Sequence, residues 1–214
     1  MINRTTLPYK IAKPLIQEGD VLLFRGQSII SYFIGRAGET SYSHVGLASW
    51  VNGCRDDNSI LELVEFRESK GGRAINLKRA VQEHPNIIDV YRPIPVWTKW
   101  EFDKDTKETH LITRKFDGKA VTRTMRQLTG LPYGYSRIWW MLKHKLVGLR
   151  LFYSAEDLML DTVKDVVYPV CSTTTAYAFN IHGYDLINNR SDEWTEPGQI
   201  AESTRLSYLF SLCP

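Results

Sequence analysis

Short apolar runs separated by turn residues dominate the first half of the chain. They are rich in β-branched and aromatic residues and too short for helices, which predicts strands. The runs cover residues 21–24, 43–50, 60–66, 73–77 and 87–92. The polar segment 51–59 joins the second and third runs, so we expect a hairpin with a long loop there. Gly71 and Gly72 mark another turn before the fourth run. Together the runs predict a small antiparallel sheet.

Helical spacing of apolar residues follows in other parts of the chain. It predicts helices over 28–34, 119–128 and 135–152, and a further helix that begins at Cys171 and ends near Gly183. A charged stretch at about 97–118 looks like an exposed excursion or hairpin inserted into the domain. We therefore expect an α+β fold, with one domain over residues 1–214.

Composition and charge narrow the class of protein only a little. The 214 residues are 43% hydrophobic and 24% charged, which is typical of a globular protein. The net charge of +3 and the lack of a dense Lys/Arg run give no reason to expect a nucleic-acid partner. No stretch resembles a signal peptide or a spanning helix, so we expect a cytoplasmic protein.

The three cysteines must be judged singly, because Cys54, Cys171 and Cys213 are widely spaced and form no CxxC pair. Cys171 lies at a predicted helix start, where free N–H groups and the helix dipole favour a thiolate. Cys54 lies in a polar turn and Cys213 next to the last residue, without an activating feature. A lone buried thiol is usually inert, so Cys171 needs a partner before it can be read as a nucleophile.

His44 is the histidine best placed to be that partner, because it opens a β-prone segment after polar turn residues. If Trp50 pairs with about residue 59 or 60, His44 lies opposite Glu65, whose carboxylate can orient the imidazole. Glu62 would point to the other face and Glu68 would fall in the turn. A bulge or a slip of one residue would change this assignment, and each glutamate is otherwise a solvated surface charge.

The order of these features resembles the permuted branch of the NlpC-type papain-like superfamily, in particular its YiiX-like group; lecithin retinol acyltransferases share the permuted order. The resemblance rests on residues 19–24, 42–47, 63–66, 71–73, 168–172 and 195–203. It implies a permuted papain-like fold with Cys171 as nucleophile, His44 as general base and then acid, and Glu65 as orienting residue. It implies no metal or organic cofactor. The charged stretch at 97–118 and Thr173–Thr175 depart from the expected pattern.

The resemblance implies a cysteine hydrolase that cleaves a peptide, isopeptide or cell-wall peptide bond through a thioester. An acyltransferase or lipid esterase is the alternative, and membrane-surface contact by the basic segment around Trp139 and Trp140 would favour it. A non-catalytic binding domain is a third reading. A zinc site at His44, Cys171 and Glu65 lacks a clear fourth ligand in the sequence. We therefore expect a peptide or acyl-bearing substrate; the oligomeric state is not predicted.

Overall fold

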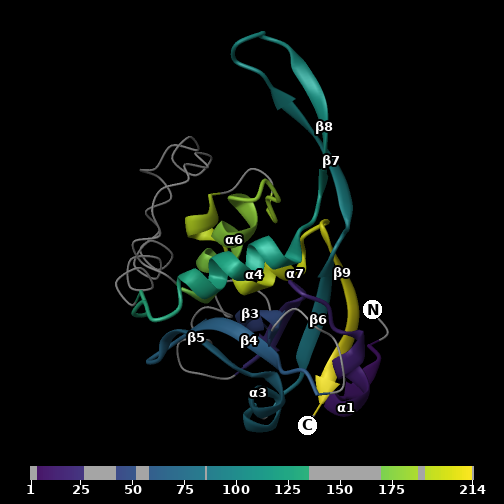
Figure 1. Cartoon of the computed structure of the whole chain (residues 1–214), viewed down its shortest axis with the longest axis vertical. Helices are drawn as coiled ribbons and strands as arrows, with labels where there is room; N and C mark the ends of the chain where they lie inside the picture. The colour runs from purple at the N-terminus through teal and green to yellow at the C-terminus, as the bar shows by residue number, and fades with distance from the viewer. Residues whose placement is uncertain are drawn as a thin grey trace, which may run out of the picture.

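The computed structural model of the protein describes residues 4–26, 42–51, 58–84, 86–134, 170–187 and 191–213. Within these ranges it has a mixed α+β fold built on a seven-stranded sheet with the order β1-β9-β6-β2-β3-β4-β5 (Figure 1). The β1–β9 pair is parallel, and every other neighbouring pair of this sheet is antiparallel. The strands are β1 (Thr6–Pro8), β2 (Val21–Arg25), β3 (Tyr42–Trp50), β4 (Leu61–Arg67), β5 (Gly71–Asn76), β6 (Ile88–Pro93) and β9 (Leu206–Cys213).

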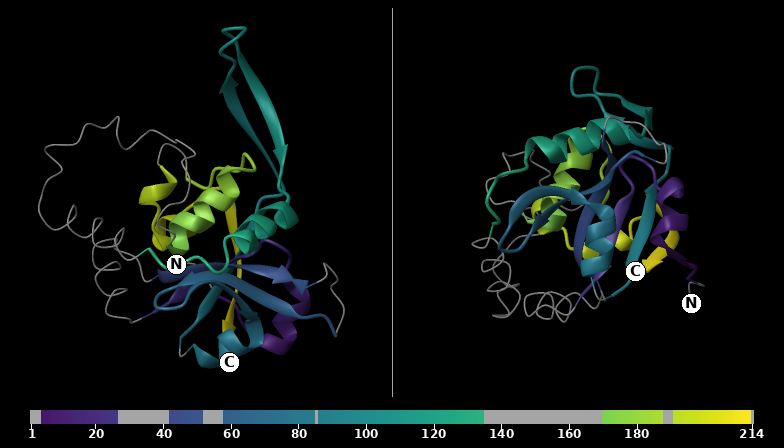
Figure 2. Two further views of the ribbon diagram at one scale, coloured as in Figure 1. Left: turned by 60° about the vertical axis from the view of Figure 1, so that its left-hand side comes forward. Right: turned by 60° about the horizontal axis from the view of Figure 1, so that its bottom comes forward.

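Helices cover both faces of this sheet (Figure 2). One face carries α4 (Gly118–Gln127), α6 (Cys171–Asn180) and α7 (Pro197–Ala201); the other carries α1 (Tyr9–Ala12) and α3 (Leu77–Glu83). Short 3₁₀ turns occur at Lys13–Leu15 and Asp192–Trp194. Both faces of a central strand such as β2 are buried. Its sequence is therefore a continuous apolar run, without the alternation of apolar and polar residues that a half-exposed strand shows.

The two faces of the sheet form two hydrophobic cores. The core beneath α4, α6 and α7 contains Val21, Leu23, Val45, Leu47, Val64, Phe66, Val121, Met125, Phe179 and Ile200, among others. The core beneath α1 and α3 contains Leu22, Phe24, Ala48, Trp50, Leu63, Leu77, Val81, Ile88 and Leu212, among others. Leu22 points into one core and Leu23 into the other, so the apolar strand β2 packs against the helices on both faces of the sheet.

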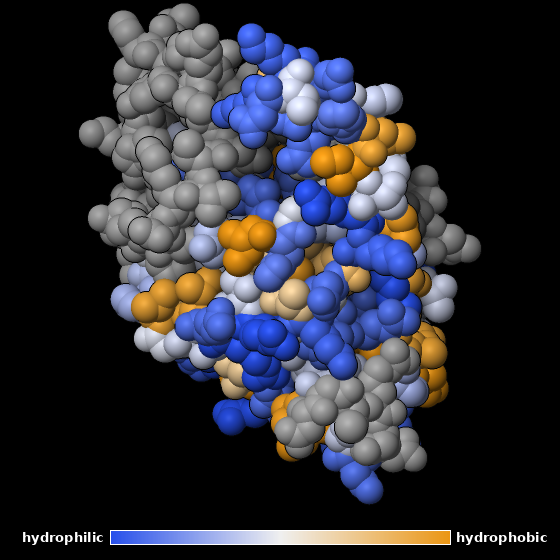
Figure 3. Space-filling view, turned by 45° about the horizontal axis from the view of Figure 1, so that its top comes forward, coloured by the Kyte–Doolittle hydropathy of each residue, from blue (hydrophilic) through white to orange (hydrophobic). Residues whose placement is uncertain are grey.

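The charged stretch folds as a separate two-stranded hairpin of β7 (Val96–Phe102) and β8 (Thr109–Lys115) that projects from the body (Figure 1). At its base Trp97 is buried against Tyr184, so the first residue of the predicted stretch belongs to the core. Farther out, Trp100 and Phe102 are 69% and 58% exposed. Figure 3 shows the side on which the hairpin rises, where hydrophilic side chains dominate and hydrophobic residues form separate patches.

Several sequence predictions need correction. The strand expected over 73–77 ends at Asn76, whose side chain accepts a hydrogen bond from the backbone N–H of Lys78 and starts α3, a helix that the apolar pattern did not reveal. Gly71 and Gly72, expected in a turn, lie in β5. β1 and β9 were not predicted. The strands expected at 21–24, 43–50, 60–66 and 87–92 and the helix at 119–128 are confirmed with small shifts of their ends.

Other predictions fall on residues outside the described ranges. These are the helices at 28–34 and 135–152, the Trp139/Trp140 segment and Cys54. Among the helices that the structure describes, none has the length and apolar character needed to cross a membrane.

Candidate active site

Cys171 is the first residue of α6, as the sequence predicted. The Thr173 hydroxyl accepts a hydrogen bond from the backbone N–H of Val170, 3.3 Å away, at the helix start. Thr174 and Thr175 donate to the carbonyl oxygens four residues back, at 2.7 and 2.8 Å. These local bonds satisfy the hydroxyls of a buried threonine run, a known arrangement in helices. The unexpected threonines therefore anchor the turn that carries the thiol.

Further contacts fix the position of α6. Gly183 adopts a left-handed conformation with φ +72°, and its N–H donates to the Asn180 carbonyl at 2.7 Å. The N–H of Tyr184 donates to the Phe179 carbonyl at 3.1 Å, which completes a Schellman motif and bears out the glycine stop. At the other end, the Ser172 hydroxyl donates to the Thr195 carbonyl at 2.6 Å. Cys171 is thus held at a defined place, and it is only 6% exposed.

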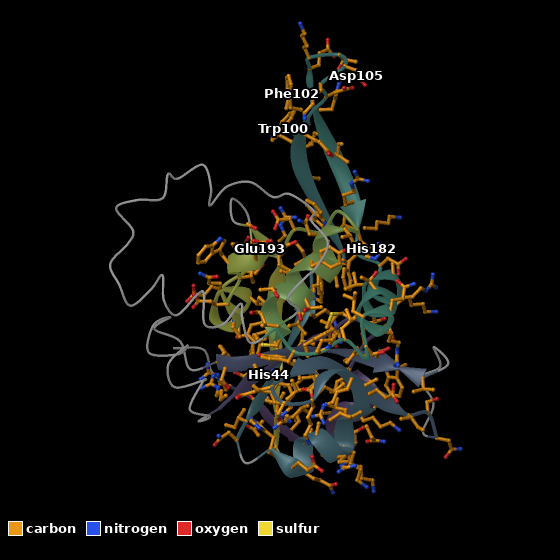
Figure 4. The ribbon with its side chains drawn as sticks, turned by 90° about the vertical axis from the view of Figure 1, so that its left-hand side faces the viewer. His44, Trp100, Phe102, Asp105, His182 and Glu193 are labelled. Carbon is orange, nitrogen blue, oxygen red and sulfur yellow. The ribbon has the colours of Figure 1, made fainter. Side chains whose placement is uncertain are left out.

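His44 lies near the start of β3, on the sheet beneath α6 (Figure 4). Its ring packs on the Phe24 ring in an edge-type arrangement with ring centres 5.1 Å apart, and Phe24 also contacts His84. Its Nε2 lies 2.6 Å from Oε2 of Glu65, and the side chain is 16% exposed. The ring is therefore oriented by one carboxylate and one aromatic neighbour.

Glu65 is fully buried in β4 and reaches His44 by a different register from the one predicted. Trp50 pairs with Leu61, and Glu65 pairs with Gly46, so His44 and Glu65 are diagonal neighbours. The glycine makes this possible: a Cβ at Gly46 would lie 3.1 Å from the Glu65 Cβ. Diagonal positions remain within reach of long side chains, so the predicted contact forms although the predicted register is wrong.

Glu62 does not take part in this contact. It pairs with Ser49 across β3 and β4, and its Oε2 accepts a hydrogen bond from Arg126 of α4 at 2.7 Å. Of the two glutamates weighed on β4, Glu65 is therefore the one placed beside His44.

Arg73 is the functional-site neighbour that sequence reasoning missed. It pairs with Glu65 across β4 and β5, and its Nε donates to Oε1 at 2.8 Å, with a second bond from its NH2 group to the same oxygen. Glu65 and Arg73 are equally spaced about Ser69 in the sequence, but this spacing is informative only once the position of the turn is known. A hairpin centred on Ser69, which has φ +61°, aligns Glu65 with Arg73. The sequence prediction instead placed the turn at Gly71 and Gly72, which lie in β5.

The charges of these groups depend on one another. Burial disfavours the His44 imidazolium, but the Glu65 carboxylate and hydrogen bonds with Cys171 and Glu65 outweigh it and raise the pKa of His44 to about 9. Burial also disfavours the Glu65 carboxylate, but His44 and Arg73 lower the pKa of Glu65 to about 2. The imidazolium thus has a buried anion on one side.

The Cys171 thiol is a second hydrogen-bond partner of that imidazole. Burial disfavours its thiolate, yet the hydrogen bond and charge of His44, together with backbone hydrogen bonds at Val45 and Ser172, lower the pKa of Cys171 below its ordinary value. Both shifts act in the direction of a thiolate–imidazolium pair, which is the reactive form of a cysteine nucleophile.

The remaining candidates lie elsewhere. Cys213 is a half-buried free thiol in β9. Burial lowers the pKa of His84, whose Nε2 lies 2.9 Å from the Arg25 carbonyl, while His182 is exposed and bonds Thr124. Within the described ranges, no three His, Cys, Asp or Glu side chains are arranged to hold a metal ion.

Comparisons with known proteins add little to this geometry. No protein-family model and no curated protein matches the chain. The solved structure of the metalloprotein YiiX from Escherichia coli O157:H7 is similar to it, with a TM-score of 0.48 and 14% identity over 92% of this chain and 98% of that chain. YiiX gives its name to the group in the sequence resemblance, and the papain-like assignment stays a prediction. Function must therefore be argued from the site.

Proposed function

We propose that the protein is a cysteine hydrolase that cleaves an amide bond of a peptide, isopeptide or cell-wall peptide on a permuted papain-like fold. The observation that carries the proposal is the chain of contacts from Cys171 through His44 to Glu65. A thiol at a helix start, an imidazole beside it and a buried carboxylate behind the imidazole are the three parts of a cysteine-based triad.

In the proposed reaction His44 takes the thiol proton, and the Cys171 sulfur attacks the substrate carbonyl carbon. Backbone N–H groups in the first turn of α6 have no partner within the helix and stabilise the oxyanion. The C–N bond breaks as the His44 imidazolium gives its proton to the leaving amine, which leaves a thioester on Cys171. Water, deprotonated by His44, then hydrolyses the thioester to a carboxylic acid and the free thiol.

Glu65 orients the His44 ring throughout this cycle. It binds Nε2 and so leaves Nδ1 as the ring nitrogen for proton exchange with the sulfur. The carboxylate stays ionised and does not itself carry the proton.

The resemblance to NlpC-type hydrolases favours amide cleavage over lipid-ester cleavage or acyl transfer on the same three residues. The Trp139/Trp140 segment, which would favour a lipid substrate, lies outside the described residues. A panel of fluorogenic peptide amides and fatty-acyl esters distinguishes the classes. Cys171-dependent turnover of the esters alone would replace the amide proposal with the esterase.

The decisive first experiment measures iodoacetamide alkylation of Cys171 between pH 4 and 9 by peptide mass spectrometry, with Cys213 as an internal reference thiol. We expect Cys171 to react well below about pH 8, where an ordinary thiol is mostly protonated, and to lose this reactivity in His44→Ala. His84→Ala is the matched control, because His84 packs on the same Phe24 ring. If Cys171 is alkylated with the same pH dependence as Cys213, and His44→Ala does not change it, the domain is a binding module.

A further inference from the structure

We infer that Arg73 is a positioning residue for the proposed reaction: it holds one oxygen of Glu65, aims the other at His44, and offsets part of the negative charge that would keep the proton on His44. The inference rests on the proposed function and deepens it. Glu65 and Cys171 both raise the pKa of His44, whereas Arg73 is the cation that binds the Glu65 carboxylate behind it.

The carboxylate of Glu65 is divided between two partners from two different strands. Arg73 of β5 bonds Oε1 through two nitrogens, whereas His44 of β3 meets Oε2 at 2.6 Å. Two donors from one planar guanidinium hold Oε1 more firmly than a single donor would. Glu65 is fully buried and Arg73 is 19% exposed, so little solvent is available to replace either contact.

The electrostatic balance around His44 explains why a cation is useful there. Glu65 and Cys171 act on His44, and Arg73 acts on Glu65. His84 interacts with His44 and Glu65 through its charge, and Arg67 acts on His84 in turn. A buried carboxylate with no second partner would hold an imidazolium proton tightly, because charge interactions strengthen as solvent is excluded. General acid catalysis needs a proton that His44 holds less tightly, since His44 must pass it to the leaving amine.

The test measures the His44 pKa by NMR titration of the imidazole in four proteins. Counting only the charges of residues 65 and 73, Arg73→Gln leaves −1 beside His44, the wild type 0, and Glu65→Gln +1. The double variant also leaves 0 but lacks the carboxylate contact. We therefore expect the order Arg73→Gln, wild type, double variant, Glu65→Gln from highest to lowest. Steps of about one pH unit, or tenfold in proton affinity, are expected.

A purely structural ion pair predicts another result. Loosening β5 would admit water to the site in Arg73→Gln and lower the His44 pKa or leave it unchanged, which would overturn the inference. Arg73→Lys, which keeps the charge, should return the value toward wild type. Arg79→Gln is the matched control, because Arg79 is an exposed arginine paired with Glu83 on α3.

Two features keep the test decisive. If Arg73→Gln does not fold, the double variant, which buries no unpaired charge, is compared with Glu65→Gln alone. Equal His44 pKa values in those two proteins would refute a role for Arg73. Alkylation of Cys171 reports separately on the proposed function. If the reactivity of Cys171 is the same with and without His44, the hydrolase proposal is refuted. If Cys171 depends on His44 but the His44 pKa does not change in Arg73→Gln, only the role of Arg73 is refuted.

Discussion

At the scale of single residues, the site depends on which side chains share a carboxylate. Residue types and predicted strand positions brought Cys171, His44 and Glu65 together as candidates, and the family resemblance favoured them over ordinary structural roles. Arg73 could not be found in the same way, because its part follows from the β4–β5 register and from the other oxygen of Glu65. Local patterns identify donors and acceptors, but the tertiary pairing decides how many partners each group has.

Acid stability tests the buried charge of Glu65. Its pKa is about 2 in the folded protein against 4.5 ordinarily, so the carboxylate stabilises the fold above about pH 4.5, and this contribution disappears as the pH falls toward 2. The loss amounts to roughly 3 kcal/mol of the free energy of unfolding at most. Urea unfolding between pH 6 and 2.5 should show this dependence in wild type and a shallower one in Glu65→Gln. Parallel curves would mean that Glu65 is not held as an anion.

At the scale of secondary structure elements, apolar runs located the central strands, whereas elements that depend on distant partners were missed. The start of α3 looks like a continuation of the preceding strand, and only the Asn76 N-cap indicates that a helix begins there. β9 has an irregular apolar pattern, and it becomes a strand through pairing with β6 and β1. The predicted register of β3 on β4 was wrong, because a long connection between two strands does not fix their pairing as a tight turn does.

Gly46→Ala tests how closely β3 and β4 are fitted at the site. The added methyl would lie 2.5 Å from the Leu63 side chain and 2.9 Å from the Val64 carbonyl oxygen, so atoms around Glu65 must move. We expect a loss of about 1–3 kcal/mol in the free energy of unfolding, typical of overpacking. Slower alkylation of Cys171 at pH 6.5 should accompany it.

Gly183→Ala serves as the comparison, because the nearest atom to its added methyl is 3.7 Å away and only the left-handed backbone opposes the change. It should cost about 1–2 kcal/mol and leave alkylation unaltered. Equal effects of both variants on Cys171 would show that general loosening, and not the space for Glu65, controls the thiol.

At the scale of the whole molecule, helix-covered strands form the body and the β7–β8 hairpin stands apart from it. Figure 4 places His44 deep in the body and Trp100, Phe102 and Asp105 on the outer part of the hairpin. The sequence revealed that this stretch is exposed, because its charges cannot be buried together. The seven-stranded order could not be derived, because placing β9 between β1 and β6 joins segments about 200 and 120 residues apart.

Trimming the hairpin tests whether the body is independent of it. Replacement of residues 99–112 by Asn-Gly keeps Trp97 and Arg114 at the base and removes Trp100, Phe102 and Leu111, which are all more than half exposed. Since exposed strands contribute little to a core, the melting temperature should change by only a few degrees and Cys171 alkylation should be unchanged. Loss of cooperative unfolding would show that the hairpin supports the body.

The parallel pairing of β1 with β9 has a mechanical consequence. Thr6 lies beside Ser211 and Pro8 beside Cys213, so tension applied along the chain from before β1 and from after β9 pulls two parallel neighbours in opposite directions. Such a load shears the pair: its hydrogen bonds resist together and do not open one after another. Under stretching, this edge of the sheet acts as a clamp, and the force at which the domain gives way is set there, far along the sheet from the thiol.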